Sequence, residues 1–198
     1  MARKDGKDKD FGSNAALMLE RLARLMRASE HDGDLNPAQW EALRYLARAN
    51  RFSNSPAALT RYLGATKGTI SQTVMALDRK GYIAKAVRPV EKRSVTLTLT
   101  AKGEEKLKQD PWTRLTIDID KLGGKTRRRL GQGLAAVLSA ELKRGELKSF
   151  GFCKTCRFFR SGDKNSADES DRCILFDQPL TISDATRLCV EHQPAKGE

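Results

Sequence analysis

The sequence predicts a mainly α protein with a small β-hairpin (the α+β class), followed by a small cysteine-bearing module. Apolar residues recur at the spacing of α-helices over most of the first 145 residues, whereas residues 82–100 change to the alternation of paired strands. All four cysteines fall in the last quarter of the 198-residue chain. We therefore expect a flexible N-terminus over residues 1–12, a helical domain over 13–145 and a cysteine-rich module over 150–194.

The first three helices are marked by their apolar spacing and by the residues at their ends. One runs from about Ser13 to Ala28, with Ser13 as a suitable cap. The second opens with Pro37, a residue that fits the first turn of a helix. The third is short, because Ser55 can cap its start and Gly64 can end it.

A fourth helix follows directly, so that two short helices are joined by a tight turn. Thr66 is its expected cap, and Ile70, Val74 and Leu77 share its apolar face. This order is the helix-turn-helix pattern, in which the second helix enters the major groove of DNA.

The remaining part of the helical domain begins with a hairpin. Apolar residues at 95, 97 and 99 alternate with polar ones, and the segment "RPVEKR" at 88–93 gives the hairpin a basic tip. A long helix is expected from about Thr100, with Pro111 marking a kink or a break. A last helix follows Gly123 and ends near Gly145.

The outer face of the fourth helix carries small, hydrogen-bonding or cationic residues. Ser71 and Gln72 can read base edges, and the hairpin tip is placed to meet phosphates or a minor groove. The predicted DNA-contacting residues are Thr66, Lys67, Gly68, Thr69, Ser71, Gln72, Arg88, Lys92 and Arg93. Taken singly, each could be ordinary solvated surface. The order of the elements, together with a net charge of +12, favours a nucleic-acid partner.

The segments "LNPAQWEALRYLA", "ATKGTISQTVMALDRKGYI" and "RPVEKRSVTLTLTAKG" resemble the winged helix-turn-helix of MarR-type transcriptional regulators over residues 13–145. The resemblance implies a homodimer with interlocking terminal helices that binds double-stranded DNA at a pseudo-palindromic operator. That family commonly has Asp-x-Arg in its wing, where this chain has Glu91-Lys92-Arg93. The resemblance therefore gives Arg93 a DNA-contacting role.

Apolar stripes on the first and last helices also predict a dimer, because one chain of this size leaves them partly uncovered. The interface candidates are Leu19, Leu22, Met26, Leu134 and Leu138. Core packing within one subunit is the competing explanation for each.

The clustered cysteines predict a metal site. Their spacing is Cys153-x2-Cys156-x16-Cys173-x15-Cys189, with His192 three residues beyond. In a cytoplasmic chain, which we expect here, structural disulfides are improbable. Buried structural cysteines or a dithiol switch at the C-x-x-C pair are alternatives. The switch would leave the last two cysteines unexplained.

Two kinds of metal site fit this spacing. Zinc could use three of the cysteines and His192, or all four cysteines. An iron–sulfur cluster would use Cys153, Cys156, Cys173 and Cys189, with the surrounding apolar residues shielding it. The segments "CKTCRFF", "CILFDQPLTI" and "LCVEH" resemble high-potential iron–sulfur proteins, which implies a [4Fe-4S] cluster. Leu188 and His192 stand where that family usually has Trp and an aromatic residue.

The sequence thus predicts a DNA-binding transcriptional regulator, more often a repressor than an activator, whose cysteine module senses redox or iron state. The main alternative is a regulator with a structural Zn²⁺ and a small-molecule effector; another is an electron-transfer protein or metalloenzyme. We expect no enzyme activity and no catalytic residue, because nothing orients a Cys–His nucleophile. No long apolar run predicts a membrane partner.

Overall fold

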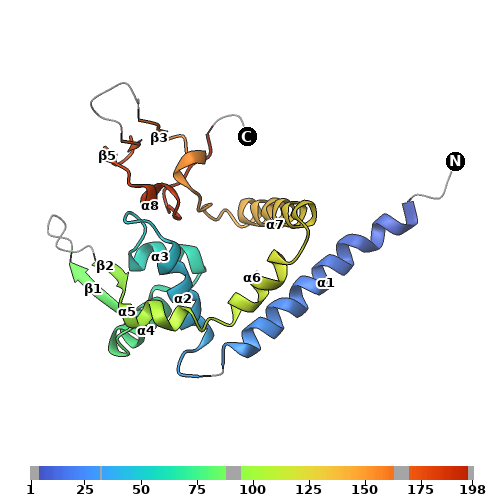
Figure 1. Cartoon of the computed structure of the whole chain (residues 1–198), viewed down its shortest axis with the longest axis horizontal. Helices are drawn as coiled ribbons and strands as arrows, with labels where there is room; N and C mark the ends of the chain where they lie inside the picture. Colours follow the sequence, from blue (N-terminus) through green and yellow to red (C-terminus); the bar gives the residue numbers. More distant parts are fainter. Residues whose placement is uncertain (1–4, 32, 88–94, 163–169, 196–198) are drawn as a thin grey trace.

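The computed structural model describes residues 5–31, 33–87, 95–162 and 170–195 (Figure 1). The helical domain consists of α1 (Asp5–Ser29), α2 (Pro37–Arg48), α3 (Pro56–Leu63), α4 (Lys67–Arg79), β1 (Ile83–Val87), β2 (Val95–Leu99), α5 (Ala101–Leu107), α6 (Trp112–Asp120) and α7 (Gly124–Arg144). The C-terminal module contains the 3-10 turn η1 (Cys153–Thr155), β3 (Phe159–Arg160), β4 (Arg172–Cys173), β5 (Gln178–Pro179) and α8 (Ile182–Ala185).

The helix ends confirm the capping residues expected in the helix-turn-helix. Ser55 accepts a hydrogen bond from the backbone N–H of Ala58, and Thr66 accepts one from that of Thr69. Gly64 follows α3 with a φ of 62°. Glycine adopts this left-handed conformation without steric cost, so the chain can turn sharply from α3 into α4.

The strands β1 and β2 form an antiparallel hairpin, with Ile83 opposite Leu99 and Val87 opposite Val95. Two helices, α5 and α6, replace the long helix expected after it, so Pro111 marks a break rather than a kink. Proline has no N–H to donate and disfavours helical backbone in the preceding residue. The carboxylate of that residue, Asp110, instead accepts from the N–H of Trp112 over 3.0 Å.

One hydrophobic core joins α2, α3, α4 and the hairpin, and we call this unit the winged domain. Its fully or almost fully buried side chains include Trp40, Leu43, Tyr45, Leu59, Ile70, Leu77, Ile83 and Leu97. Val190, from the C-terminal module, is part of the same core. The module is therefore packed into the winged domain, as its position above α2 and α3 in Figure 1 also shows.

Helix α1 begins earlier in the sequence than we predicted. It begins at Asp5 rather than near Ser13, so residues 5–12, which we predicted to be flexible, are helical from Asp5 onward. A serine costs little inside a helix, and a capping residue therefore marks a possible helix start without fixing it. Among the described residues, no helix is long and apolar enough to cross a membrane.

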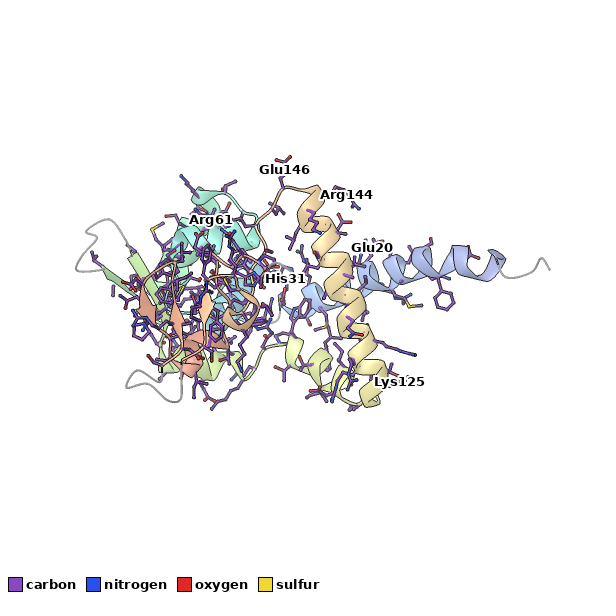
Figure 2. The ribbon with its side chains drawn as sticks, turned by 90° about the horizontal axis from the view of Figure 1, so that it is seen from above. Glu20, His31, Arg61, Lys125, Arg144 and Glu146 are labelled. Carbon is purple, nitrogen blue, oxygen red and sulfur yellow. The ribbon has the colours of Figure 1, made fainter. Side chains whose placement is uncertain are left out.

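Helices α1, α6 and α7 extend away from the winged domain (Figure 1). No residue of α6 or α7 is buried. In Figure 2, α7 runs from Lys125 to Arg144 with its side chains projecting outward. The large apolar side chains exposed on α1 and α7 are Phe11, Leu17, Met18, Leu19, Leu22, Leu25, Leu130, Leu134, Val137 and Leu138.

A polar network fixes the end of α1 and the start of α6 to the winged domain. The buried carboxylate of Glu30, just after α1, pairs with Arg44 of α2 and accepts from the indole N–H of Trp112 over 2.7 Å. Arg44 also binds Asp110 over 2.9 Å. Met26, a predicted interface residue, is 6% exposed and is therefore packed within the subunit.

Candidate nucleic-acid interface and cysteine cavity

The outer face of α4 is built as the sequence predicts. Ile70, Val74 and Leu77 are buried against the winged-domain core. The predicted contact residues of this helix are all exposed; they are Thr66, Lys67, Gly68, Thr69, Ser71 and Gln72. A hydrogen bond of 2.9 Å joins the hydroxyls of Thr66 and Thr69, so the first turn of the helix has a fixed shape.

The predicted DNA contacts of the wing lie between β1 and β2 in the sequence. Arg88, Lys92 and Arg93, with Glu91, lie outside the described residues, so their DNA contacts stay predictions. The visible part of the hairpin adds Lys85, whose ammonium lies 2.8 Å from the Asp78 carboxylate.

A groove runs between α3, α4 and the hairpin beside the outer face of α4. Its polar lining residues are Thr60 and Arg61 of α3, Lys67 and Ser71 of α4, and Lys85 of β1. The other lining residues are apolar: Pro56, Ala57, Ile70, Val74, Met75 and Val95. Thr60, Arg61 and Lys85 were not among the predicted site residues. No alternation in β1 marks Lys85, because every residue of this strand after Ile83 is exposed.

The four cysteines, distant in sequence, line one narrow cavity in the C-terminal module. Cys153, Cys173 and Cys189 are between 7% and 9% exposed, Cys156 is half-buried, and all four are free thiols. The other residues that line this cysteine cavity are Asn50, Phe52, Phe158, Phe159, Leu175, Phe176, Leu180 and Glu191. The predicted apolar shell around the thiols is thus largely present.

Short backbone pairings bring these cysteines together. The turn η1 closes with a 2.9 Å hydrogen bond from the N–H of Cys156 to the carbonyl of Cys153. Cys173 pairs with Phe159 across β3 and β4. Cys189 pairs with Gly151, the residue that precedes the first turn of the module.

The thiols influence one another. Burial raises the pKa of Cys153 to about 12, and the nearby Cys189, Cys173 and Cys156 raise it further. Burial also raises the pKa of Cys189, although the N–H of Glu191 and the side chains of Asn50 and Ser53 lower it. Four mutually close thiolates would repel one another in this setting unless a cation shared them.

His192, the alternative metal ligand, does not line the cysteine cavity. It borders a separate surface pocket with Lys148 and Gln193, and its Nε2 lies 3.0 Å from the Thr155 hydroxyl. Burial lowers its pKa. Gly151 packs against the imidazole so closely that a Cβ there would lie 2.5 Å from Nδ1.

The cysteine module docks on the linker between α2 and α3, residues 49–55. The N–H of Leu188 donates to the carbonyl of Arg48 over 2.7 Å, and the N–H of Asn50 donates back to Leu188 over 2.9 Å. The N–H of Val190 donates to the buried Ser53 hydroxyl over 2.8 Å. Cys189 is therefore held between two residues that are bonded to the winged domain.

Aromatic and ionic contacts extend the interface between the cysteine module and the winged domain. Phe52 of the linker stacks on Phe176 of the module, with ring centroids 4.3 Å apart. Glu191 pairs with Arg61 of α3 over 3.0 Å. Sequence reasoning did not identify the linker residues, because their role depends on contacts between segments more than a hundred positions apart.

A single metal ion would need at least three ligand side chains close together. Within the residues that the structure describes, no three histidine, cysteine, aspartate or glutamate side chains are close enough to hold one.

Comparisons with known proteins agree with this architecture. The model of the MarR family matches residues 33–94. FabT from Streptococcus pneumoniae in complex with DNA is 18% identical, with a TM-score of 0.54 over 68% of this chain and 97% of that one. A MarR transcriptional regulator from Methanosarcina mazei Go1 is 23% identical, with a TM-score of 0.53 over 68% and 98%.

The S. aureus MepR–DNA complex is 16% identical, with a TM-score of 0.51 over 66% of this chain and 96% of that one. A comparison with curated proteins found no match. These matched structures cover about two thirds of the chain. Residues 33–94 are thus similar to the MarR family, and the chain has the winged-helix fold of MarR-type transcriptional regulators.

Proposed function

We propose that the chain is a homodimeric transcriptional regulator that binds a pseudo-palindromic operator and whose cysteine module holds an oxygen- or redox-sensitive [4Fe-4S] cluster. The observation that carries the sensing part is the convergence of Cys153, Cys156, Cys173 and Cys189 on one apolar cavity. The DNA-binding part rests on the exposed outer face of α4 beside the hairpin.

Major-groove readout needs a helix with short or hydrogen-bonding residues on its free face. On α4, Ser71 and Gln72 supply hydrogen-bonding groups, Gly68 allows close approach, and Lys67 supplies a charge for phosphate. FabT and MepR, which share this fold, are described in complex with DNA. We extend that activity to this chain.

A dimer would cover the apolar side chains that α1 and α7 leave exposed. A protein surface rarely carries so many large apolar residues on neighbouring helices unless a partner buries them. Two copies related by a two-fold axis would also present two α4 helices to successive major grooves. The ion pair of Glu30 with Arg44 ties α1 to α2, so dimer geometry is transmitted to α4.

The cavity favours a cluster over a single zinc ion. A tetrahedral zinc site brings its sulfurs to about 3.8 Å from one another, given Zn–S bonds of about 2.3 Å. In a cubane cluster each thiolate binds a different iron, so the sulfurs stand further apart. Four cysteines on one apolar cavity supply the four thiolates that such a cluster needs. A zinc site that uses His192 would require this side chain to reach the cysteine cavity, which it does not line.

A cluster in this cavity would supply a one-electron or oxygen-labile centre whose state is the signal. The route to DNA runs through Cys189, because Leu188 is bonded to Arg48 and Asn50, and Val190 to Ser53. A displacement of Cys189 would therefore shift the linker that positions α3 and α4. The effect would be a change in the spacing of the two α4 helices of the dimer.

The proposal is tested by selecting an operator from random DNA with protein purified without air. The affinity for this operator is then compared before and after the metal is removed with a chelator and an oxidant. We expect a sequence-specific complex whose affinity changes on metal removal. No selected sequence would contradict DNA binding, and equal affinities would contradict sensing by the module.

A further inference from the structure

One buried side-chain amide of the linker between α2 and α3, that of Asn50, lines the cysteine cavity. Asn50 is 1% exposed and lines this cavity with all four cysteines. Its Nδ2 is buried without a hydrogen-bond partner. A buried amide N–H without an acceptor destabilises the fold, so its retention at this place needs an explanation.

The orientation of this amide is fixed by its other end. The Oδ1 atom of Asn50 accepts a hydrogen bond from the N–H of Phe52 over 3.1 Å. Only the carbonyl oxygen can accept there, so Nδ2 must point to the opposite side. The amide therefore cannot relieve its unpaired N–H by flipping.

Cys189 is the cysteine that the backbone brings beside this donor. The backbone N–H of Asn50 donates to the carbonyl of Leu188, the residue before Cys189, over 2.9 Å. The N–H of Val190, the residue after Cys189, donates to the Ser53 oxygen, which leaves the Ser53 O–H free to donate. Asn50 and Cys189 thus line the same cavity on segments that are bonded to each other.

We propose that Asn50 donates an N–H···S hydrogen bond to the cysteine-bound centre at Cys189 and thereby sets the reduction potential of that centre. Asn50 belongs to the α2–α3 linker and acts as a positioning residue. The inference rests on the proposed cluster. Reduction places more negative charge on the thiolate and sulfide sulfurs, and an N–H donor stabilises that charge. Asn50 therefore raises the potential and links the state of the centre to the α2–α3 linker.

A purely structural Asn50, which only closes the turn to Phe52, is the competing explanation. Two variants separate the roles: Asn50→Ala removes both hydrogen bonds, while Asn50→Ser keeps a neutral acceptor for the Phe52 N–H and loses the amide donor. Asn54→Ala is the matched control. Asn54 also has a buried, unpaired side-chain atom, but it lines the neighbouring pocket with Leu97 and Glu104.

The experiment uses full-length protein purified without air. Iron and acid-labile sulfide are measured first, and then the midpoint potential of the one-electron couple, with an electrode as the electron source. We expect both Asn50 variants to keep the cluster with a midpoint shifted to more negative values. The Asn54→Ala midpoint should equal that of the parent.

Equal midpoints for the parent and both Asn50 variants would overturn the role of Asn50 and leave the proposed cluster intact. A parent protein without iron and sulfide would overturn the cluster and the inference together. If Asn50→Ala does not fold, Asn50→Ser alone decides, because it keeps an acceptor for the Phe52 N–H and adds no charge.

Discussion

Leu188 and Ala49 form a parallel β-bridge, which attaches the residue before Cys189 to the end of α2. The bridge makes the C-terminal module an integral part of the winged domain, because Val190 on the other side of Cys189 lies in the winged-domain core. A centre bound by Cys189 would therefore lie next to residues that are bonded to the end of α2 and to the α2–α3 linker.

Base recognition by α4 is tested at Gln72. We expect Gln72→Ala to cost about 1–3 kcal/mol of binding free energy at one base position and to relax specificity there. Gln109→Ala, at an exposed glutamine beyond the end of α5, is the control and should bind as the parent does. Quantitative binding to an operator and its single-base variants measures both. Unchanged specificity in Gln72→Ala would exclude this face of α4.

Dimerisation is tested by placing a charge on the exposed apolar side chains of the terminal helices. Leu22→Glu or Leu138→Glu should lower the dimer fraction and, with it, the stability and the DNA affinity, because folding and association are linked. Ile182→Glu is the control, since Ile182 is 86% exposed on α8 in the module. Sedimentation at micromolar concentration gives the result. A folded monomer of the parent would contradict the dimer.

The choice of metal is tested by one pair of variants. With a cluster, Cys173→Ser should lose visible absorption and His192→Ala should keep it. With zinc bound by three cysteines and a histidine, His192→Ala should lose metal and Cys173→Ser should keep it. Iron, zinc and acid-labile sulfide are measured in each variant, because a four-cysteine zinc site would share the dependence on Cys173.

Close packing between α5 and the hairpin is tested at Gly103. A Cβ at this position would lie 2.1 Å from the carbonyl oxygen of Tyr82. Gly103→Ala should therefore destabilise the fold by about 2 kcal/mol or more. Gly131→Ala on α7 has open space around it and should be neutral or stabilise by up to about 1 kcal/mol. Urea unfolding compares them, and an equal response at both glycines would contradict the packing.

A pH dependence is expected from Asp34, which pairs with Lys106 over 2.8 Å and accepts from the Tyr82 hydroxyl over 2.6 Å. The bonds to Lys106 and Tyr82 lower its pKa from 3.8 to about 2. A lowered carboxyl pKa stabilises the fold above about pH 4, and this contribution is lost as the pH falls towards 2. Because Asp34 is exposed, solvent screening keeps the effect small.

The test compares the parent with Asp34→Asn. The variant should be less stable at pH 6, and the difference in unfolding free energy should shrink between pH 5 and pH 3. A difference that stays constant over this range would show that the carboxylate charge is not responsible.

Local patterns were sufficient to predict the helix-turn-helix. Gly64 and Thr66 define its turn through backbone conformation and capping, and Ile70, Val74 and Leu77 define the buried face of α4 through their spacing. The break at Pro111 was predicted only as one of two options, since proline permits either a kink or a new helix. These features depend on residues that are neighbours in sequence.

The cysteine site was only partly predictable. The spacing of the cysteines indicates a shared ligand, but it contains no information on Asn50 or Ser53, which bond to Leu188 and Val190 on either side of Cys189. Met26 was predicted as an interface residue, with core packing as the alternative, and it is buried within its own subunit. The sequence could not decide between the two, because an apolar stripe looks the same whether its own subunit or a partner covers it. Long-range packing decides both questions.

The measurement that tests the central claim most directly is the iron and acid-labile sulfide content of full-length protein purified without air. The account predicts brown protein with broad visible absorption and about four irons and four sulfides per chain, as a [4Fe-4S] cluster held by four cysteines requires. Colourless protein with one zinc per chain, or with no metal at all, would contradict it.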